Sequence, residues 1–139
     1  MIDLKINLLD PECMPYKKYP NDAGIDLKCN EDVLILPGET RLIPSGICVA
    51  IPMGYVGDIS PRSSISMKGI VIQGKIDPEY RGQVGIIATN CSNVAQHFVK
   101  HERIAQLILL KIDYPCIRIV EELNNTDRGN KGYGSTGNK

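Results

Sequence analysis

The amino-acid sequence predicts an all-β protein of the sandwich or jelly-roll type, with one short helix and a flexible C-terminal tail. Apolar residues come in short β-branched runs that Pro, Gly and Asn separate, which is typical of strands. Turn signals recur between these runs at the spacing found in sandwiches and jelly rolls. The last stretch, residues 124–139, contains no Val, Ile, Leu or Phe, so it cannot offset its own ordering entropy and is predicted to be disordered until it binds something.

The strands follow in order from these runs. They are predicted at residues 2–9, 33–36, 41–51, 55–60, 84–90, 103–112 and 116–120, with turns at 36–39, 52–54 and 77–79. The composition of the run from Arg103 to Leu110 is also compatible with a helix. Its length and the nearby Pro115 favour a strand that is buried on both faces.

One short helix is predicted after Pro61. Ser63 or Ser64 would cap a turn over Ile65 to Lys68. The first N–H groups of such a turn have no partner inside the helix and are free to bind an anion. Residues 61–64 are therefore a candidate phosphate site.

The length and composition predict one compact domain over residues 1–123, followed by a tail over 124–139. A chain of 139 residues with 42% hydrophobic content can build one core without a disulfide or structural metal. Sixteen basic residues balance sixteen acidic ones, so no general electrostatic field would hold nucleic acid or an anionic membrane. Any polyanion must therefore be bound locally.

The five cysteines indicate a reducing compartment. Their number is odd, they are widely spaced, and no CxxC pair is present. The sequence contains no signal-peptide pattern and no run of about 20 apolar residues that could span a membrane. The expectation is a soluble intracellular protein, cytoplasmic or, in a eukaryotic host, nuclear.

The tail carries a GxGxxG pattern at residues 132–137, which is found in dinucleotide-binding folds. Only two residues follow it, so there is no room for the helix that such a fold needs, and no GK[ST] makes it a Walker loop. Its glycines would still expose N–H groups to phosphate, with hydroxyls from Ser135 and Thr136 and a forked cation from Arg128. The alternative is a solvated linker.

Three other features are ambiguous when taken singly. Asp77 begins a turn with Pro78, and could be either an ordinary turn residue or a general base, with Tyr80 as its apolar neighbour. Asp26 either makes a turn hydrogen bond or serves a metal's water shell. His97 and His101 are four residues apart but have no third ligand nearby in the sequence, so we expect ordinary polar positions and not a zinc site.

Taken together and in order, five segments resemble the motifs of trimeric dUTP pyrophosphatases. The resemblance covers nearly the whole chain, and five motifs in sequence are far more specific than any one of them. The segments are AGIDL at 23–27, PRSSI at 61–65, GKIDPEYRG at 74–82, RIAQL at 103–107 and RGNKGYGSTG at 128–137.

This resemblance implies a distorted jelly-roll or β-barrel subunit in a homotrimer, with each active site assembled from three chains. It also implies Mg²⁺-assisted hydrolysis of dUTP to dUMP and pyrophosphate, which keeps uracil out of DNA and supplies dUMP for thymidylate synthesis. Carboxylate bases, hard oxygen-bound cations and converging N–H donors are the groups that this chemistry requires.

The resemblance also implies roles for single residues. Asp77 would activate the water that attacks the α-phosphate, and Tyr80 would pack on the deoxyribose and exclude a ribose 2′-hydroxyl. Asp26 would bind the Mg²⁺ ion through water. The backbone around Gly74 would pair with the uracil edge. Phosphate contacts would come from Arg62, Ser63, Ser64 and Gln106.

In the tail, the resemblance implies that Tyr133 stacks on uracil. The terminal phosphates would be held by Arg128, Gly134, Ser135 and Thr136. Two positions depart from the family pattern, which usually has Gly-Asp where this chain has His101-Glu102 and Phe where it has Tyr133.

Two alternative functions share the expected fold. A dCTP deaminase also has an Arg-Ser-Ser segment but does not need the hairpin from Asp77 to Tyr80 in this form. A catalytically silent protein that senses dUTP would use the same fold to bind a partner.

Overall fold

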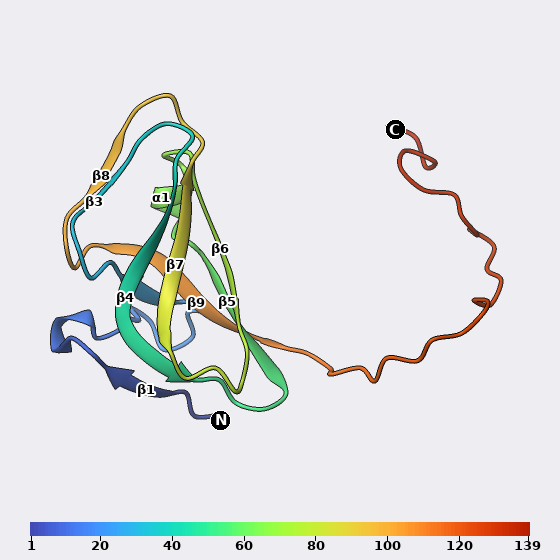
Figure 1. The fold of residues 1–139 in the computed structure, drawn as a ribbon, viewed down its shortest axis with the longest axis horizontal. Coiled ribbons are helices and arrows are strands. Elements are labelled where there is room, and N and C mark those ends of the chain that lie inside the picture. Colours follow the sequence, from blue (N-terminus) through green and yellow to red (C-terminus); the bar gives the residue numbers. More distant parts are fainter.

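Nine strands form a curved seven-stranded sheet and a separate two-stranded sheet, as a computed structural model of residues 1–139 shows (Figure 1). The strand order of the large sheet is β1-β4-β7-β6-β5-β9-β2, and every pairing is antiparallel. The strands are β1 (Lys5–Leu8), β2 (Ile25–Lys28), β3 (Val33–Ile35), β4 (Thr40–Ala50), β5 (Tyr55–Pro61), β6 (Ile70–Ile76), β7 (Gln83–Asn90), β8 (Gln96–Phe98) and β9 (Arg103–Lys111).

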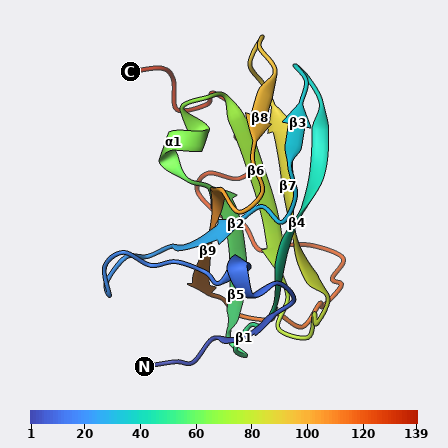
Figure 2. The same ribbon diagram turned by 90° about the vertical axis from the view of Figure 1, so that its left-hand side faces the viewer.

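The short elements pack against this framework. Strands β3 and β8 pair with each other, and a 3₁₀ turn, η1 (Pro11–Cys13), follows β1. The single α-helix, α1 (Ser63–Ser66), directly follows β5 and is seen at the side of the sheet in Figure 2. The predicted all-β fold with one short helix is confirmed.

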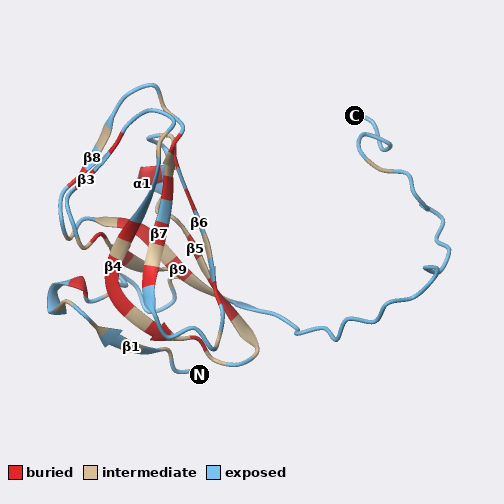
Figure 3. Ribbon diagram, viewed as in Figure 1, coloured by how far each residue is buried: buried red, intermediate tan, exposed pale blue.

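The core lies between the curved sheet and the β3–β8 sheet. Figure 3 shows buried positions alternating with less buried ones along β7, as expected where successive side chains point to opposite faces. In β4 the alternation is broken at residues 45–47, where the pairing with β7 shifts register. Ile, Val and Leu dominate a buried cluster that also holds Phe98, the only phenylalanine of the chain. In β9, Ile104, Ala105 and Leu107 are all buried, which confirms the predicted strand over its helical alternative.

The turns lie where the sequence predicts them, at Pro37-Gly38, Met53-Gly54 and Pro78-Glu79. Gly38 and Gly54 have φ of 78° and 90°, a left-handed conformation that glycine adopts at low cost. Strands β2, β6 and β8 are additions to the predicted set. Gly74 lies within β6.

Helix α1 begins earlier than predicted. Arg62 occupies the N-cap position without a side-chain hydrogen bond to the helix, and the helix starts at Ser63. The predicted serine cap is therefore wrong. The reason lies outside the helix, because Pro61 pairs with Ala105 of β9 and Arg62 is fixed by contacts to β2 and β9.

Beyond β9 the chain leaves the domain as an extended arm, residues 113–139, that runs away from the sheets in Figure 1. The strand predicted at 116–120 does not form in the single chain, since those residues pair with no other strand. Ile117 and Ile119 are 92% and 93% exposed. No helix in the structure has the length and apolar character needed to cross a membrane.

Candidate active site

Strand register brings three of the predicted site segments together. Asp26 of β2 lies opposite Gln106 of β9, which in turn lies opposite Ser60 of β5. Directly opposed residues project from the same face of a sheet. Residues that are 80 positions apart in the sequence, Asp26 and Gln106, are therefore neighbours.

Two guanidinium groups converge on one oxygen of Asp26. Arg62 Nε lies 3.0 Å from Asp26 Oδ2, and Arg103 Nη1 lies 3.1 Å from the same atom. Arg62 also donates from Nη1 to the Arg103 carbonyl at 3.2 Å. The Arg103 guanidinium stands over the Tyr16 ring, 4.3 Å from its centroid. These contacts fix both arginines before any ligand binds.

Gly24 is required by the position of Gln106. A Cβ atom at residue 24 would collide with the Gln106 side-chain oxygen. Gln106 is itself held by donation from its Nε2 to the Pro61 carbonyl at 3.0 Å. The glycine of the first motif thus makes room for the glutamine of the fourth.

The start of α1 offers unpaired N–H donors. Ile65 and Ser66 both donate to the Arg62 carbonyl at 2.9 Å, whereas the backbone N–H groups of Ser63 and Ser64 have no backbone acceptor. These two donors are the kind of group that binds a phosphate oxygen at a helix N-terminus.

These residues surround a polar hollow of about 470 Å³, called here the phosphate hollow. Tyr16 is its only hydrophobic lining residue. Four cationic side chains against two carboxylates give it a positive balance that the chain as a whole lacks. The lining consists of Tyr16, Lys17, Lys18, Asp22, Gly24, Asp26, Arg62, Ser63, Arg103 and Gln106.

A second site region lies where strands β6 and β7 separate. The two strands pair from Ile70↔Asn90 to Gln73↔Ile87, and no pairing continues beyond that point. From Gly74 onward, β6 pairs only with β5 on its other side. The facing backbone groups of β6 are therefore left open toward β7.

A hollow of about 280 Å³, called here the hairpin hollow, occupies the gap between the separated strands. Asp77 and Tyr80 line it from the connecting loop, and Gln83, Gly85 and Ile87 line it from β7. The Tyr80 hydroxyl donates to the Gln83 carbonyl at 2.9 Å, which fixes the ring across the loop. Asp77 is exposed, and no donor holds its carboxylate.

The predicted site residues therefore fall into three groups within one chain. Asp26, Arg62, Ser63 and Gln106 line the phosphate hollow, whereas Asp77 and Tyr80 line the hairpin hollow, and the two hollows share no lining residue. Ser64 lies beside Ser63 on α1, and Gly74 lies at the fork of β6 and β7.

The third group is the tail, which touches neither hollow. Arg128 donates from Nε to the Lys131 carbonyl at 2.8 Å, a contact within the tail itself. Tyr133 is fully exposed, with Gly134, Ser135 and Thr136 in the turns that follow. The last contact between the arm and the domain is the Tyr114 hydroxyl, which accepts from Gly54 N–H at 2.9 Å and donates to the Tyr55 carbonyl at 3.2 Å.

The sequence analysis missed several residues of the phosphate hollow. Arg103 was predicted to begin a strand and was given no site role, yet it shares Asp26 with Arg62. Tyr16 reaches the hollow through an isolated bridge in which it and Asp26 exchange backbone hydrogen bonds of 3.1 and 2.7 Å. The two adjacent lysines, Lys17 and Lys18, were the one sequence signal for this side of the phosphate hollow.

Known proteins resemble this chain over most of its length. A family model described as dUTPase matches residues 10–137. The deoxyuridine 5′-triphosphate nucleotidohydrolase of Cutibacterium acnes is 42% identical over 132 residues, covering 91% of this chain and 87% of that protein. The enzyme of the same name from Variola virus is 44% identical over 124 residues, covering 88% and 84%.

Solved structures agree with the fold. A single-residue variant of the dUTPase of Staphylococcus bacteriophage 80alpha, bound to dUpNHpp, superposes with a TM-score of 0.90 at 32% identity and covers 99% of each chain. A variant of the phage phi11 dUTPase, described for its coordination of a structural Mg(II) ion, gives a TM-score of 0.81 at 29% identity, covering 89% and 100%. The predicted distorted jelly roll is confirmed.

Proposed function

The chain belongs to the dUTPase family, and from that premise we propose that three chains of a homotrimer together complete each active site. The protein hydrolyses dUTP to dUMP and pyrophosphate and uses Mg²⁺. The observation that carries the proposal is the separation of the site residues. The phosphate hollow and the hairpin hollow share no lining residue, and the tail runs away from both inside one chain (Figure 1).

The hairpin hollow is the proposed nucleoside site. Open backbone groups from Gly74 onward would pair with the uracil edge, because β7 does not use them. The Tyr80 ring would pack on the deoxyribose, and its bond to the Gln83 carbonyl keeps it in place. Steric exclusion of a 2′-hydroxyl by a fixed ring discriminates better than a merely apolar pocket.

Asp77 is the proposed general base. Its exposed carboxylate lines the hollow beside Tyr80 and is free to accept a proton from water. A positioned carboxylate of this kind contributes to proton transfer in the transition state. The water would attack the α-phosphate of a nucleotide whose base and sugar occupy the same hollow.

The phosphate hollow is the proposed triphosphate site, presented to the hairpin of a neighbouring chain. Arg62, Ser63, Ser64 and Gln106 would contact phosphate oxygens, and the structure adds Arg103 to this set. Since both arginines are already fixed on Asp26, little ordering is needed when the phosphates bind.

The phosphate hollow also fits the Mg²⁺ ion. Its lining offers oxygen donors from Asp22, Asp26, Ser63 and Gln106 and contains neither histidine nor cysteine, as a hard cation prefers. Both arginine contacts to Asp26 use Oδ2, which leaves Oδ1 to accept from metal-bound water. Bound there, Mg²⁺ would supply charge neutralisation on the phosphates.

The arm supports an assembly of several chains. Ile117, Ile119 and Leu123 are each at least 85% exposed, and the apolar run at 116–120 has no strand partner within its own chain. Exposed apolar side chains at this density mark an interaction surface. A second chain would supply the missing partner and carry the tail to a neighbouring site.

In the tail, Tyr133 would stack on uracil, and the terminal phosphates would be held by Arg128, Gly134, Ser135 and Thr136.

Neither of the two alternative functions gains support, since the family and the named relatives are dUTPases. The domain division at residue 123 is retained as a proposal: residues 113–123 of the arm belong to the folded unit, and residues 124–139 form the phosphate-binding tail.

The test compares the wild-type protein with Asp77→Asn. Wild type should release pyrophosphate from dUTP and no ammonia from dCTP. The Asn variant should still bind dUTP but lose on the order of 10²-fold or more in turnover. Near-normal turnover in the variant would remove Asp77 from the mechanism, and ammonia release from dCTP would contradict the reaction itself.

A further inference from the structure

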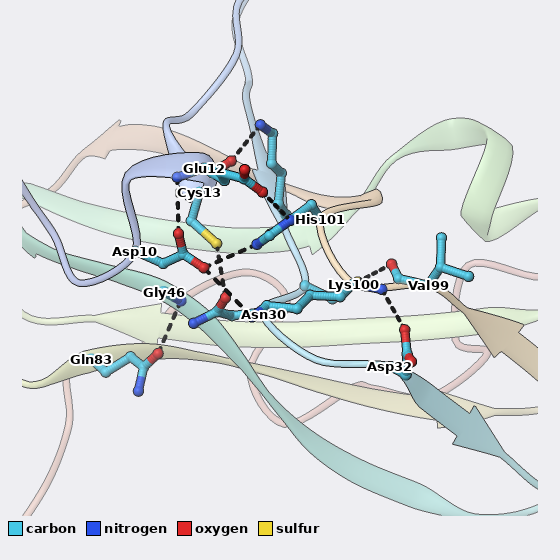
Figure 4. A network of polar contacts seen from close by, with 12 residues as sticks. Asp10, Glu12, Cys13, Asn30, Asp32, Gly46, Gln83, Val99, Lys100 and His101 are labelled. Carbon is cyan, nitrogen blue, oxygen red and sulfur yellow. Dashed lines mark hydrogen bonds and ion pairs between the residues drawn. The ribbon is translucent and has the colours of Figure 1, made fainter.

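A cluster of metal-ligating side chains lies outside both hollows, where the N-terminal segment meets the turn before β9. Figure 4 shows Asp10, Cys13 and His101 pointing toward one another. One ligand atom from each of the three lies within 4.8 Å of the other two. None of these residues lines the phosphate hollow or the hairpin hollow.

The first two ligands are held by the 3₁₀ turn η1. Asp10 is its N-cap and accepts from the Glu12 N–H through Oδ1 at 2.9 Å, so Oδ2 is left to face His101. Cys13 is 1% exposed, and its thiol lies 3.4 Å from Asn30 Oδ1. Any Cβ at Gly46 would fall 2.6 Å from the Cys13 sulfur, so that glycine leaves the sulfur its space.

His101 reaches the cluster at a conformational cost. Its φ is 71°, in the left-handed region that residues other than glycine rarely adopt. The backbone is held there by donation from the His101 N–H to the Cys29 carbonyl at 2.7 Å. A strained residue of this kind persists only where its surroundings fix it, and such residues gather at functional sites.

Both ring nitrogens of His101 meet carboxylates. Nε2 lies 3.0 Å from Asp10 Oδ2, and Nδ1 lies 2.8 Å from Glu12 Oε2. If Nε2 binds a metal ion, Nδ1 carries the ring proton and can donate it to Glu12 Oε2. In metal sites, the second ring nitrogen usually donates to a carboxylate that orients the ring, which is the position of Glu12 here.

The neighbouring charges leave room for a cation. Lys100 Nζ is 3.8 Å from Asp10 Oδ2, but this lysine is about half exposed and can turn toward solvent. Lys28 donates to the Glu12 carbonyl and not to its carboxylate.

We propose that Asp10, Cys13 and His101 bind one Zn²⁺ ion, with Glu12 orienting the His101 ring and water completing the coordination. A sulfur, a nitrogen and an oxygen ligand suit zinc, at bond lengths of about 2.0–2.3 Å, and do not suit Mg²⁺. The ion would draw the three ligands inward, and the Cys13 thiol would release its proton to solvent as the S–Zn bond forms.

This site would join two parts of the chain that are far apart in sequence. It connects η1 near the N-terminus to the turn that ends at Glu102, and the next residue, Arg103, enters the phosphate hollow. Zinc would therefore stabilise the folded chain and the position of Arg103. The proposal is independent of which residues carry out dUTP hydrolysis.

The test uses full-length protein freed of metal by a chelator and then titrated with Zn²⁺, with Mg²⁺ alone as the comparison. One zinc per chain should bind and raise Tm, because a ligand that binds only the folded state stabilises it. Substitution with Co²⁺ should give tetrahedral d–d bands and a sulfur-to-cobalt charge-transfer band. Mg²⁺ should produce no such shift in Tm.

Conservative variants assign the ligands. Asp10→Asn keeps an N-cap residue, and His101→Asn keeps a residue that tolerates positive φ, so both should fold and lose most of the zinc-dependent rise in Tm. Cys13→Ser should lose the charge-transfer band. Glu12→Gln should weaken zinc binding roughly 10- to 100-fold.

Two variants outside the cluster serve as controls. His97→Asn removes the only other histidine, and Cys48→Ser removes a thiol that lies elsewhere, so both should bind zinc like wild type. The proposal is overturned if wild type takes up no zinc. It is also overturned if Asp10→Asn and His101→Asn keep the full zinc-dependent rise in Tm, in which case His101 only joins two carboxylates.

Discussion

The phosphate hollow and the C-terminal tail differ in how the chain holds their residues. In the hollow, Arg62 and Arg103 are both fixed on Asp26 by contacts of 3.0 and 3.1 Å. In the tail, Arg128 contacts only Lys131, and Tyr133 is fully exposed. One half of the proposed site is organised before the substrate arrives, and we propose that the other half gains its structure from the substrate and a neighbouring chain.

The largest effect should come from removing the tail. Truncation before Arg128 deletes the residues proposed to hold the terminal phosphates, and activity should fall on the order of 10²-fold or more. Thermal unfolding should stay unchanged, since the tail makes no contact with the domain. Deleting only Asn138 and Lys139 is the matched control and should preserve activity. Full activity of the longer truncation would show that the tail is a linker.

A smaller effect on activity, with an effect on stability, is expected for Arg103→Lys. Lysine keeps the charge but cannot bind Asp26 and phosphate with a planar fork. The KM for dUTP should rise roughly tenfold, equivalent to about 1.4 kcal/mol of binding. The free energy of unfolding should fall by about 1 kcal/mol. Arg118→Lys, in the exposed arm, should change neither the KM nor the free energy of unfolding. Equal effects of the two substitutions would contradict the difference between the fixed hollow and the exposed arm.

We propose that the preference for dUTP over UTP depends on the fixed loop that carries Tyr80. Tyr80→Ala should lower the preference for dUTP over UTP by roughly tenfold or more, because the ring no longer blocks a 2′-hydroxyl. Tyr80→Phe loses only the bond to the Gln83 carbonyl and should keep most of the preference. Competition assays with UTP measure both, and an unchanged ratio in the alanine variant would exclude this role for the ring.

The smallest expected effect is a pH dependence of stability. It should come from a carboxylate in the folded domain and not from one in the exposed arm. The Leu36 N–H donates to the Glu39 carboxylate at 2.9 Å, and together with Arg41 it lowers the pKa of Glu39 below its ordinary 4.5. Stabilisation from Glu39 is thus present above about pH 4.5 and is lost as pH falls through the lowered pKa. Glu39→Gln should flatten this acid limb in unfolding curves, whereas Glu121→Gln should leave it as in wild type.

The sequence predicts the fold well where local pattern and tertiary position agree. Turns such as Pro37-Gly38 are specified by residue chemistry that acts over a few positions. Strand β6 was missed because Gln73, Gly74 and Lys75 interrupt its apolar run. Strand β8, Gln96–Phe98, is too short and polar to show an alternating pattern.

The motifs name most of the candidate site, but the sequence alone does not place the residues relative to one another. The pairing of Asp26 with Gln106 depends on strand register between distant segments. From the sequence, Arg103 is only the first residue of a strand. The strand register places it next to Arg62, and both contact Asp26. The apolar run at 116–120 has the pattern of a strand, yet its partner is absent from its own chain.

Subunit mixing tests the central claim most directly. Asp77→Asn chains and chains truncated before Arg128 should each be nearly inactive, because each lacks one part of the site. Unfolded together and refolded, they should regain activity well above the sum of the two parents, since mixed trimers would contain some sites with every part intact. Activity that stays at that sum, while native mass spectrometry shows mixed trimers, would contradict an active site shared between chains.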